Sequence, residues 1–345
     1  MLRRKIMVIL LLAVILVLII PFNYLDPPEP PIENQLIIYG AANFDDVKPL
    51  LDAFEAKYPE VKVEYITNGP PILYTRLMGE ILDEQPTADV VMLTLRYQLA
   101  LTDGGYLEAY KTPESSSYPS NLKDADGFWT AAQLNPVIQV YNPQSLSQDD
   151  LPKTIDDLVD PKWIGEVTIH DVTLGTVGTI WLASLKSTMG DKWTSFVEEL
   201  AKLDPARFGP PGLVGSAVSG GGFDIGLTVY LHDFLRIKAE GEPIERLNVE
   251  GLPVLYTISP VSITKNATNQ VAAKRFVDFI LSEEGQKIID NSETRISARP
   301  NIDAQKTLTK LFPEEEFIQF PTDDAYLNAN SYRDYFITLF RSQEL

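Results

Sequence analysis

Short apolar runs alternate with helical apolar repeats along most of the chain, a pattern typical of strands alternating with helices. In the clearest example, residues 36–39 read LIIY, and apolar residues then recur every three or four positions from Val47 to Tyr58. The small residues 40–42 join this predicted strand to the predicted helix, and Asn43 lies at the position of a helix N-cap. Such a turn exposes free N–H groups that can bind an anion or a polar ligand, although an ordinary strand-to-helix connection has the same pattern.

The alternation continues along the chain and predicts an α/β fold with a largely parallel sheet covered on both faces. Further strands are expected at residues 61–66, 89–93, 137–141 and 167–170. Further helices are expected around residues 73–81, 97–103, 175–189, 193–202, 225–239 and 272–280. The strand at 137–141 is bounded by two Asn-Pro pairs, and the helix at 225–239 follows a glycine-rich joint.

The N-terminus has the pattern of a membrane-targeting segment. Arg3, Arg4 and Lys5 precede an unbroken apolar run over residues 6–20. Positive residues ahead of such a run predict a cytoplasmic N-terminus and a body outside the membrane. Because no A-x-A cleavage site follows and no cysteine is available for lipidation, residues 1–25 are predicted to be an uncleaved anchor, with a cleaved signal as the alternative. The proline-rich residues 26–34 then form an extended spacer.

Composition and motifs exclude several classes of protein. The formal net charge of −19 argues against binding to nucleic acid, and the absence of cysteine excludes disulfides and thiolate sites. The two histidines, His170 and His232, are not part of a metal-binding pattern, and the sequence contains none of the common hydrolase or phosphate-loop motifs. The chain is therefore predicted not to be an enzyme and to need no cofactor, with a secreted hydrolase as a less favoured alternative.

A second turn suited to ligand binding lies at residues 171–179, which read DVTLGTVGT between a predicted strand and a predicted helix. Its three threonines and two glycines place hydroxyls and unpaired N–H groups together at a helix start. This combination suits an anionic or hydroxyl-bearing ligand, but plain helix capping explains it equally well.

Several segments, in the same order, resemble one family: the solute-binding proteins of ABC importers, in the branch that includes ferric-iron binders. The resemblance extends over residues 36–300. It rests on YGAA at 39–42 with VKPLLDAF at 47–54, ADVV at 88–91, GYLEAY at 105–110, DGFW at 126–129 leading to VYN at 140–142, DDL at 156–158 with DPKWIGE at 160–166, and AAKRFVDF at 272–279 with LSEEGQ at 281–286.

The resemblance implies a two-lobe periplasmic-binding-protein-like fold of type II, with a ligand cleft between lobes joined by crossing strands. Lobe 1 would comprise residues 35–137 and about 258–300, and lobe 2 residues 138–257; the helical residues 301–345 are not assigned to either lobe. The resemblance also implies a monomer that captures a small polar or anionic solute outside the cytoplasm and delivers it to a permease and an ATPase. A membrane-tethered sensor or scaffold with the same fold is the alternative.

The expected ligand-binding residues lie at turns that follow strand ends, where ligands of open α/β sheets bind. They are Ala41, Asn43, Asn68, Gly69, Thr94, Arg96, Asn135, Thr173, Gly175, Thr176, Tyr230 and Tyr256.

The identity of the ligand stays open at this point. Iron binders of the branch carry adjacent tyrosines after the glycine-rich joint, whereas this chain has Tyr230 alone, and Asn43 replaces a frequent histidine. Tyr230 and Asp233 would still serve if the cargo were Fe³⁺; an organic anion, a phosphorylated molecule, a polyamine or a vitamin are the other candidates. A glycosylation motif at Asn266 is a single short match and has no predicted role.

Overall fold

The computed structural model describes residues 34–174, 176–209, 211–252, 254–292, 295–300, 312, 317–319 and 322–341. The predicted anchor or signal at 1–25 and all of the predicted spacer except Asn34 lie outside these residues. Within the described part, no helix combines the length and the apolar character that crossing a bilayer requires.

Strands and helices alternate through the first half of the chain, as predicted. The strands are β1 (Gln35–Gly40), β2 (Lys62–Thr67), β3 (Val90–Met92), β4 (Leu107–Glu108), β5 (Thr130–Tyr141), β6 (Val167–His170), β7 (Ala206–Phe208), β8 (Ile225–Tyr230), β9 (Glu245–Leu247), β10 (Val254–Thr264), β11 (Ile296–Ser297) and β12 (Phe317–Gln319). The helices are α2 (Phe44–Lys57), α3 (Pro70–Leu82), α4 (Leu95–Asp103), α5 (Ile155–Leu158), α6 (Thr176–Met189), α7 (Trp193–Lys202), α8 (Pro211–Ser219), α9 (Leu231–Ala239), α10 (Gln270–Leu281), α11 (Glu283–Asn291), α13 (Thr322–Leu327) and α14 (Ala329–Arg341).

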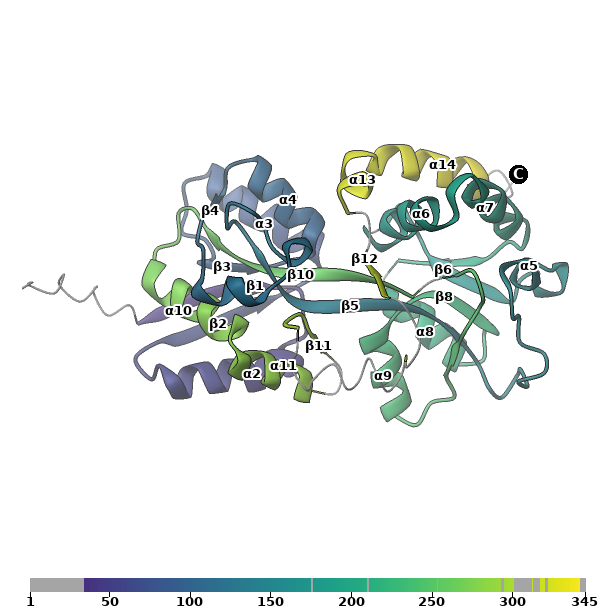
Figure 1. Ribbon diagram of the computed structural model, residues 1–345, viewed down its shortest axis with the longest axis horizontal. Coiled ribbons are helices and arrows are strands. Elements are labelled where there is room, and N and C mark those ends of the chain that lie inside the picture. The colour runs from purple at the N-terminus through teal and green to yellow at the C-terminus, as the bar shows by residue number, and fades with distance from the viewer. Residues whose placement is uncertain are drawn as a thin grey trace, which may run out of the picture. The chain divides into compact units, whose positions relative to one another are not determined.

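The first lobe is built on a parallel sheet in which β1 lies between β2 and β3. Side chains of β1 alternate between two hydrophobic clusters because successive residues of a strand point to opposite faces. Leu36 and Ile38 pack with α2 and α10, whereas Tyr39 packs with α3 and α4. Both faces of the sheet are thus covered by helices, and the carboxyl ends of β1 and β3 remain at its edge (Figure 1).

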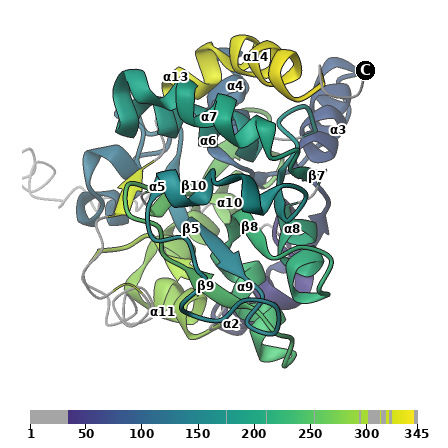
Figure 2. The ribbon, with the colours of Figure 1, turned by 90° about the vertical axis from the view of Figure 1, so that its right-hand side faces the viewer.

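In the second lobe the sheet continues from β5 to β8, β6 and β7, and β6 pairs in parallel with β7 and β8. Trp181 from α6 and Phe196 from α7 are buried in the cluster that covers one of its faces. The C-terminal helices α13 and α14 lie along α6 and α7 (Figures 1 and 2), and Phe336 and Phe340 are buried in the same cluster. The last described helices are therefore part of the core of this lobe.

Two long antiparallel strands, β5 and β10, run through both lobes (Figure 1). One end of β10 pairs with β3 and β4 of the first lobe, and the far end of β5 pairs with β8 and β9 of the second. The register between the two strands shifts at Ser259 and Pro260. This arrangement confirms the predicted type II fold, with two α/β lobes joined by crossing strands.

Two predicted elements differ from the structure. Residues 225–239 were expected to be helical throughout, but Ile225–Tyr230 forms β8, and the helix α9 begins only at Leu231. β8 lies in the middle of the sheet, and five of its six residues are buried. Its sequence is therefore a continuous apolar run, which periodicity alone does not distinguish from a buried helix. The strand expected at 137–141 begins at Thr130, because β5 continues through Asn135 and Pro136 opposite β10.

Replacing Thr154 by alanine is expected to lower the free energy of unfolding by about 1 kcal/mol. The Thr154 hydroxyl accepts a hydrogen bond from the Asp157 N–H at 3.2 Å, and the Asp157 carboxylate accepts one from the Thr154 N–H at 2.9 Å, which forms a capping box for α5. Urea unfolding would measure the change. Thr75→Ala is the control, since that exposed hydroxyl bonds only to the carbonyl of Pro71, and a loss as large as that of Thr154→Ala would contradict the capping account.

Candidate functional site

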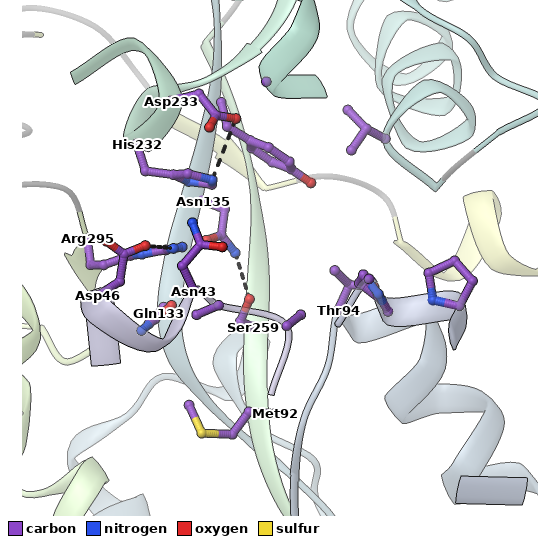
Figure 3. Close-up of a pocket in the computed structure, with 18 of the residues that line it drawn as sticks. Asn43, Asp46, Met92, Thr94, Gln133, Asn135, His232, Asp233, Ser259 and Arg295 are labelled. Carbon is purple, nitrogen blue, oxygen red and sulfur yellow. Dashed lines mark hydrogen bonds and ion pairs between the residues drawn. The ribbon is translucent and has the colours of Figure 1, made fainter. Parts of the chain in front are cut away.

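A cavity of about 660 Å³ lies between the two lobes, and both lobes and the crossing strands contribute to its lining. The first lobe contributes the turns that follow β1, β2 and β3, and the crossing strands contribute Gln133, Asn135 and Ser259. Asn135 donates a hydrogen bond to the Ser259 hydroxyl at 2.9 Å, which links β5 to β10 at the cavity wall (Figure 3). The second lobe contributes His170, Leu174, Val177, Gly209, Gly212, Tyr230, His232, Asp233 and Arg236. A cavity of this size holds a small organic molecule.

Four helices begin at this cavity, and α2, α4 and α9 place N-terminal backbone N–H groups around it, whereas α3 begins with Pro70 and Pro71, which have no N–H. Asn43, Gly69, Thr94 and Tyr230 line the cavity and are the N-cap residues of α2, α3, α4 and α9. None of these N-cap residues accepts a hydrogen bond from its own helix through its side chain. Because the first N–H groups of a helix lack internal partners and its N-terminus carries partial positive charge, this arrangement favours an anionic ligand.

Two arginine–aspartate pairs line one part of the cavity, and Figure 3 shows the pair of Arg295 with Asp46. Arg295, which is 8% exposed, binds the Asp46 carboxylate through Nη2. Arg236 Nη2 lies 3.0 Å from Asp233 Oδ1. Burial raises the pKa of Asp233, although the hydrogen bond from Arg236 opposes this effect. Both arginines are thus held in fixed positions by carboxylates.

The aromatic and imidazole groups of the cavity are uncharged near neutral pH. Tyr230 stacks on His232, with ring centroids 4.9 Å apart. Burial raises the pKa of Tyr230, so its phenol stays protonated. Burial, together with Arg295 and Arg236, holds the pKa of His232 well below its usual range, and burial lowers the pKa of His170 to about 4. The two histidines therefore present neutral imidazoles, which donate at one nitrogen and accept at the other.

A multidentate metal site is not formed within the part of the chain that the structure describes, since no three histidine or carboxylate side chains converge there. Tyr230 and Asp233, the ligands expected if the cargo is iron, both line the cavity. A protonated phenol and a carboxylate already bound to Arg236 are weak donors for a hard cation such as Fe³⁺.

The cavity brings together about half of the residues that sequence analysis selected: Ala41, Asn43, Gly69, Thr94, Asn135 and Tyr230. The two turns predicted to suit ligand binding both contribute to the lining, the first through Ala41 and Ala42 and the second through Leu174 and Val177. Whether these residues contact the ligand stays a prediction.

Four of the selected residues are not part of the lining: Asn68, Arg96, Thr173 and Tyr256. The Asn68 side chain accepts the N–H of Gly69, the Thr173 hydroxyl donates to Asp171, and Arg96 lies over the ring of Tyr97. The side chains of Asn68 and Thr173 thus stabilise their own turns, and that of Arg96 contacts a neighbouring ring. Gly175 and the side chain of Thr176 lie outside the described residues.

Sequence reasoning missed several lining residues with polar side chains: Asp46, Gln133, His170, His232, Arg236, Ser259 and Arg295. Arg236 carried a local signal, because it follows Asp233 by one helical turn. Asp46 lies in the first turn of α2, where an acidic residue is common and indicates no binding role. Arg295 carried no signal, since its partner Asp46 is 249 residues away in the sequence.

Comparison with known proteins identifies the family. Residues 85–329 match the model of a family described as bacterial extracellular solute-binding proteins. The chain belongs to this family. Iron uptake protein A1 of Synechocystis sp. is 25% identical to this solute-binding protein over 288 residues, which cover 76% of this chain and 77% of that protein.

Two solved structures share the fold. Iron-bound HitA from Pseudomonas aeruginosa superposes with a TM-score of 0.75 at 22% identity, covering 88% of this chain and 99% of that one. The periplasmic binding protein AfuA from Actinobacillus pleuropneumoniae, bound to fructose-6-phosphate, gives a TM-score of 0.73 at 24% identity, covering 89% and 98%. These likenesses confirm the fold predicted from the family resemblance.

Family membership also settles the class of function. The family consists of extracytoplasmic proteins that bind solutes rather than transform them, which confirms the prediction that this chain is a binding protein and not an enzyme. The predicted membrane anchor, the permease partner and the identity of the solute go beyond this conclusion.

Proposed function

We propose that this solute-binding protein captures a small organic anion in its interlobe cavity and delivers it to the permease and ATPase of an ABC importer. The observation that carries the proposal is the convergence on one cavity of about 660 Å³ of three helix N-termini with free N–H groups, those of α2, α4 and α9, and of two arginines, the buried Arg295 and the exposed Arg236. The partial positive charge of helix N-termini and the N–H groups of the guanidinium groups stabilise an anion. AfuA, which shares the fold, has a phosphorylated sugar in its structure.

Ferric iron is the second candidate, because the HitA structure is iron-bound and the Synechocystis relative is an iron uptake protein. Two features of the cavity weigh against it. The two carboxylates that line the cavity, Asp46 and Asp233, are already paired with Arg295 and Arg236, and the protonated Tyr230 would have to lose its proton before it could bind a cation. Iron binding here would therefore require these ion pairs to break or an accompanying anion to supply ligands.

A ligand panel separates these candidates. The full chain, purified in a mild detergent, would be unfolded by heat with sugar phosphates, sugar acids, polyamines, thiamine, and Fe³⁺ with and without carbonate. A ligand at a hundred times its Kd adds about 2.7 kcal/mol of stability, which raises Tm by several degrees. We expect a shift with an organic anion. A shift with Fe³⁺ alone would favour the second candidate, and a shift with polyamines alone would contradict anion binding.

The importer role and the membrane anchor are proposed together. A tethered binding protein stays close to its permease, which raises the effective concentration of the loaded form. The anionic solute would serve as cargo of a monomeric carrier, and cells lacking the chain should lose uptake of that solute. Normal uptake without the chain would instead support the sensor or scaffold alternative.

A further inference from the structure

The sheet divides the cavity into two ends that carry different side chains. Neighbouring strand residues such as Val137 and Ile138 belong to different hydrophobic clusters, because they point to opposite faces of the sheet. Helices α2 and α9 pack in the cluster on one face, whereas α3 of the first lobe and α6 of the second pack in the clusters on the other. Figure 1 shows α3, α4 and α6 on one side of β5 and β10, and α2 and α9 on the other.

The charged end of the cavity lies at the starts of α2 and α9 and contains Asp46, Asp233, Arg236 and Arg295. The two ion pairs lie close together, since Arg295 and Asp46 both act on the pKa of Asp233. In Figure 3, Asp46, Asp233 and Arg295 lie on one side of Ser259, and Thr94 lies on the other. The side chain of Arg236 is 45% exposed, so its N–H groups are accessible to a ligand. Together with the first N–H groups of α2 and α9, which belong to opposite lobes, they suit an acidic group.

The apolar end of the cavity lies at the starts of α3, α4 and α6 and contains Pro70, Pro71, Tyr97, Leu174 and Val177. Leu174 is 64% exposed, and Pro71 is exposed as well. The ring of Tyr97 is held against that of Tyr74, with centroids 5.1 Å apart. Since Pro71 and Tyr97 belong to the first lobe and Leu174 to the second, an apolar group placed here is covered from both lobes. Removing this exposed apolar surface from water favours binding.

A hydroxyl-bearing group would find few partners at the apolar end. Pro70 and Pro71 have no N–H, so the start of α3 offers no donor from these residues. Two other polar side chains from the neighbouring segments, Thr94 and His170, have Oγ1 and Nδ1 atoms with almost no accessible surface. A hydroxyl moved from water to this place would lose hydrogen bonds that the side chains do not replace, which is costly.

We infer that the solute is an organic anion with an apolar ring, whose acidic group binds at the charged end and whose ring binds at the apolar end. This inference rests on the proposed function and narrows its ligand class. A ring packs well against the flat faces of Tyr97 and the two prolines. The acidic group can be a phosphate ester or a carboxylate, because both present oxygen acceptors to a guanidinium.

Calorimetric titration of the full chain tests the inference with matched probes. Phenyl and naphthyl phosphate, benzoate and naphthoate carry both the ring and the charge. Fructose-6-phosphate carries the charge on a hydroxylated body, and benzyl alcohol carries the ring without the charge. We expect at least one ring-bearing anion to bind about tenfold or more tightly than fructose-6-phosphate and benzyl alcohol. The tightest binder then identifies the acid as phosphate or carboxylate.

Substitutions at the two ends assign their roles. Leu174→Asn should weaken binding of the tightest ring-bearing anion about tenfold, because it removes apolar surface that the ring covers. Leu82→Asn is the matched control, since Leu82 is 71% exposed and lies outside the cavity. Arg236→Gln should weaken the same anion about 20-fold through the loss of charge-assisted hydrogen bonds. Melting curves of the unliganded variants show whether each one folds.

Each outcome decides the inference. Fructose-6-phosphate binding as tightly as every ring-bearing anion would overturn it and leave the proposal of an organic-anion carrier intact. Equal affinities of Leu174→Asn and Leu82→Asn for the ring-bearing anion would also overturn it, because the ring would then bind elsewhere. Absence of binding to any organic anion would overturn both the inference and the proposed function.

Discussion

Replacing Gln286 by leucine is expected to lower the free energy of unfolding by about 3–5 kcal/mol. Gln286 is fully buried, and its amide nitrogen donates to the carbonyls of Ala132 at 3.0 Å and Ile280 at 2.8 Å. Its amide oxygen accepts hydrogen bonds from the Ser297 hydroxyl and from the N–H groups of Ala298 and Arg299, at 2.7, 3.0 and 3.1 Å. Leucine has a similar volume but would leave most of these buried groups unpaired, each at a cost of about 1–3 kcal/mol.

The same substitution should also weaken ligand binding, because Gln286 holds the segment that follows Arg295. That segment, β11, pairs with β5 beside Gln133, and Gln133 lines the cavity. Urea unfolding and calorimetric titration would measure the two effects. Gln85→Leu is the control, since Gln85 is exposed and donates only to the carbonyl of Asp83. A loss below 1 kcal/mol in Gln286→Leu would show that the surrounding groups find other partners.

Local pattern was enough to predict the elements that bring backbone groups to the cavity. The strand at 36–39, its small-residue turn and the helix after Asn43 are found as β1 and α2, and the turn lines the cavity. Such a unit is encoded by neighbouring residues, because its strand period, its turn and its helix period lie within about twenty positions.

Long-range pairing explains what could not be predicted. Arg295 lies between α11 and β11, and it reaches the cavity because Gln286 and the pairing of β11 with β5 hold that segment. Nothing near Arg295 in the sequence indicates its contact with Asp46. The strand β8 was missed for a related reason: its apolar run is a strand because β5 and β6 flank it in the sheet. Tertiary context, rather than propensity, decides such segments.

Acidification from pH 6.5 to pH 4 is expected to remove roughly 3 kcal/mol of stability through His170 alone. Burial lowers the pKa of His170 from 6.5 to about 4, while the Asp171 carboxylate opposes this shift. Between these two values the unfolded chain holds a proton on this imidazole and the folded chain does not. The contribution of His170 to stability is therefore complete above pH 6.5 and is lost as the pH falls to about 4. His232 changes stability in the same direction, whereas the raised pKa of Asp233 acts in the opposite one.

The substitution His170→Gln isolates this contribution. Glutamine cannot titrate, so the difference in the free energy of unfolding between pH 7 and pH 4 should be smaller in the variant by roughly 3 kcal/mol. Urea unfolding of both unliganded proteins at half-unit pH intervals would measure it, and comparing each protein with itself cancels any constant cost of the substitution. Parallel pH profiles would mean that His170 becomes charged without cost in the folded protein. The cavity would then present an additional positive charge at His170 in acid, which would favour a ligand with more negative charge.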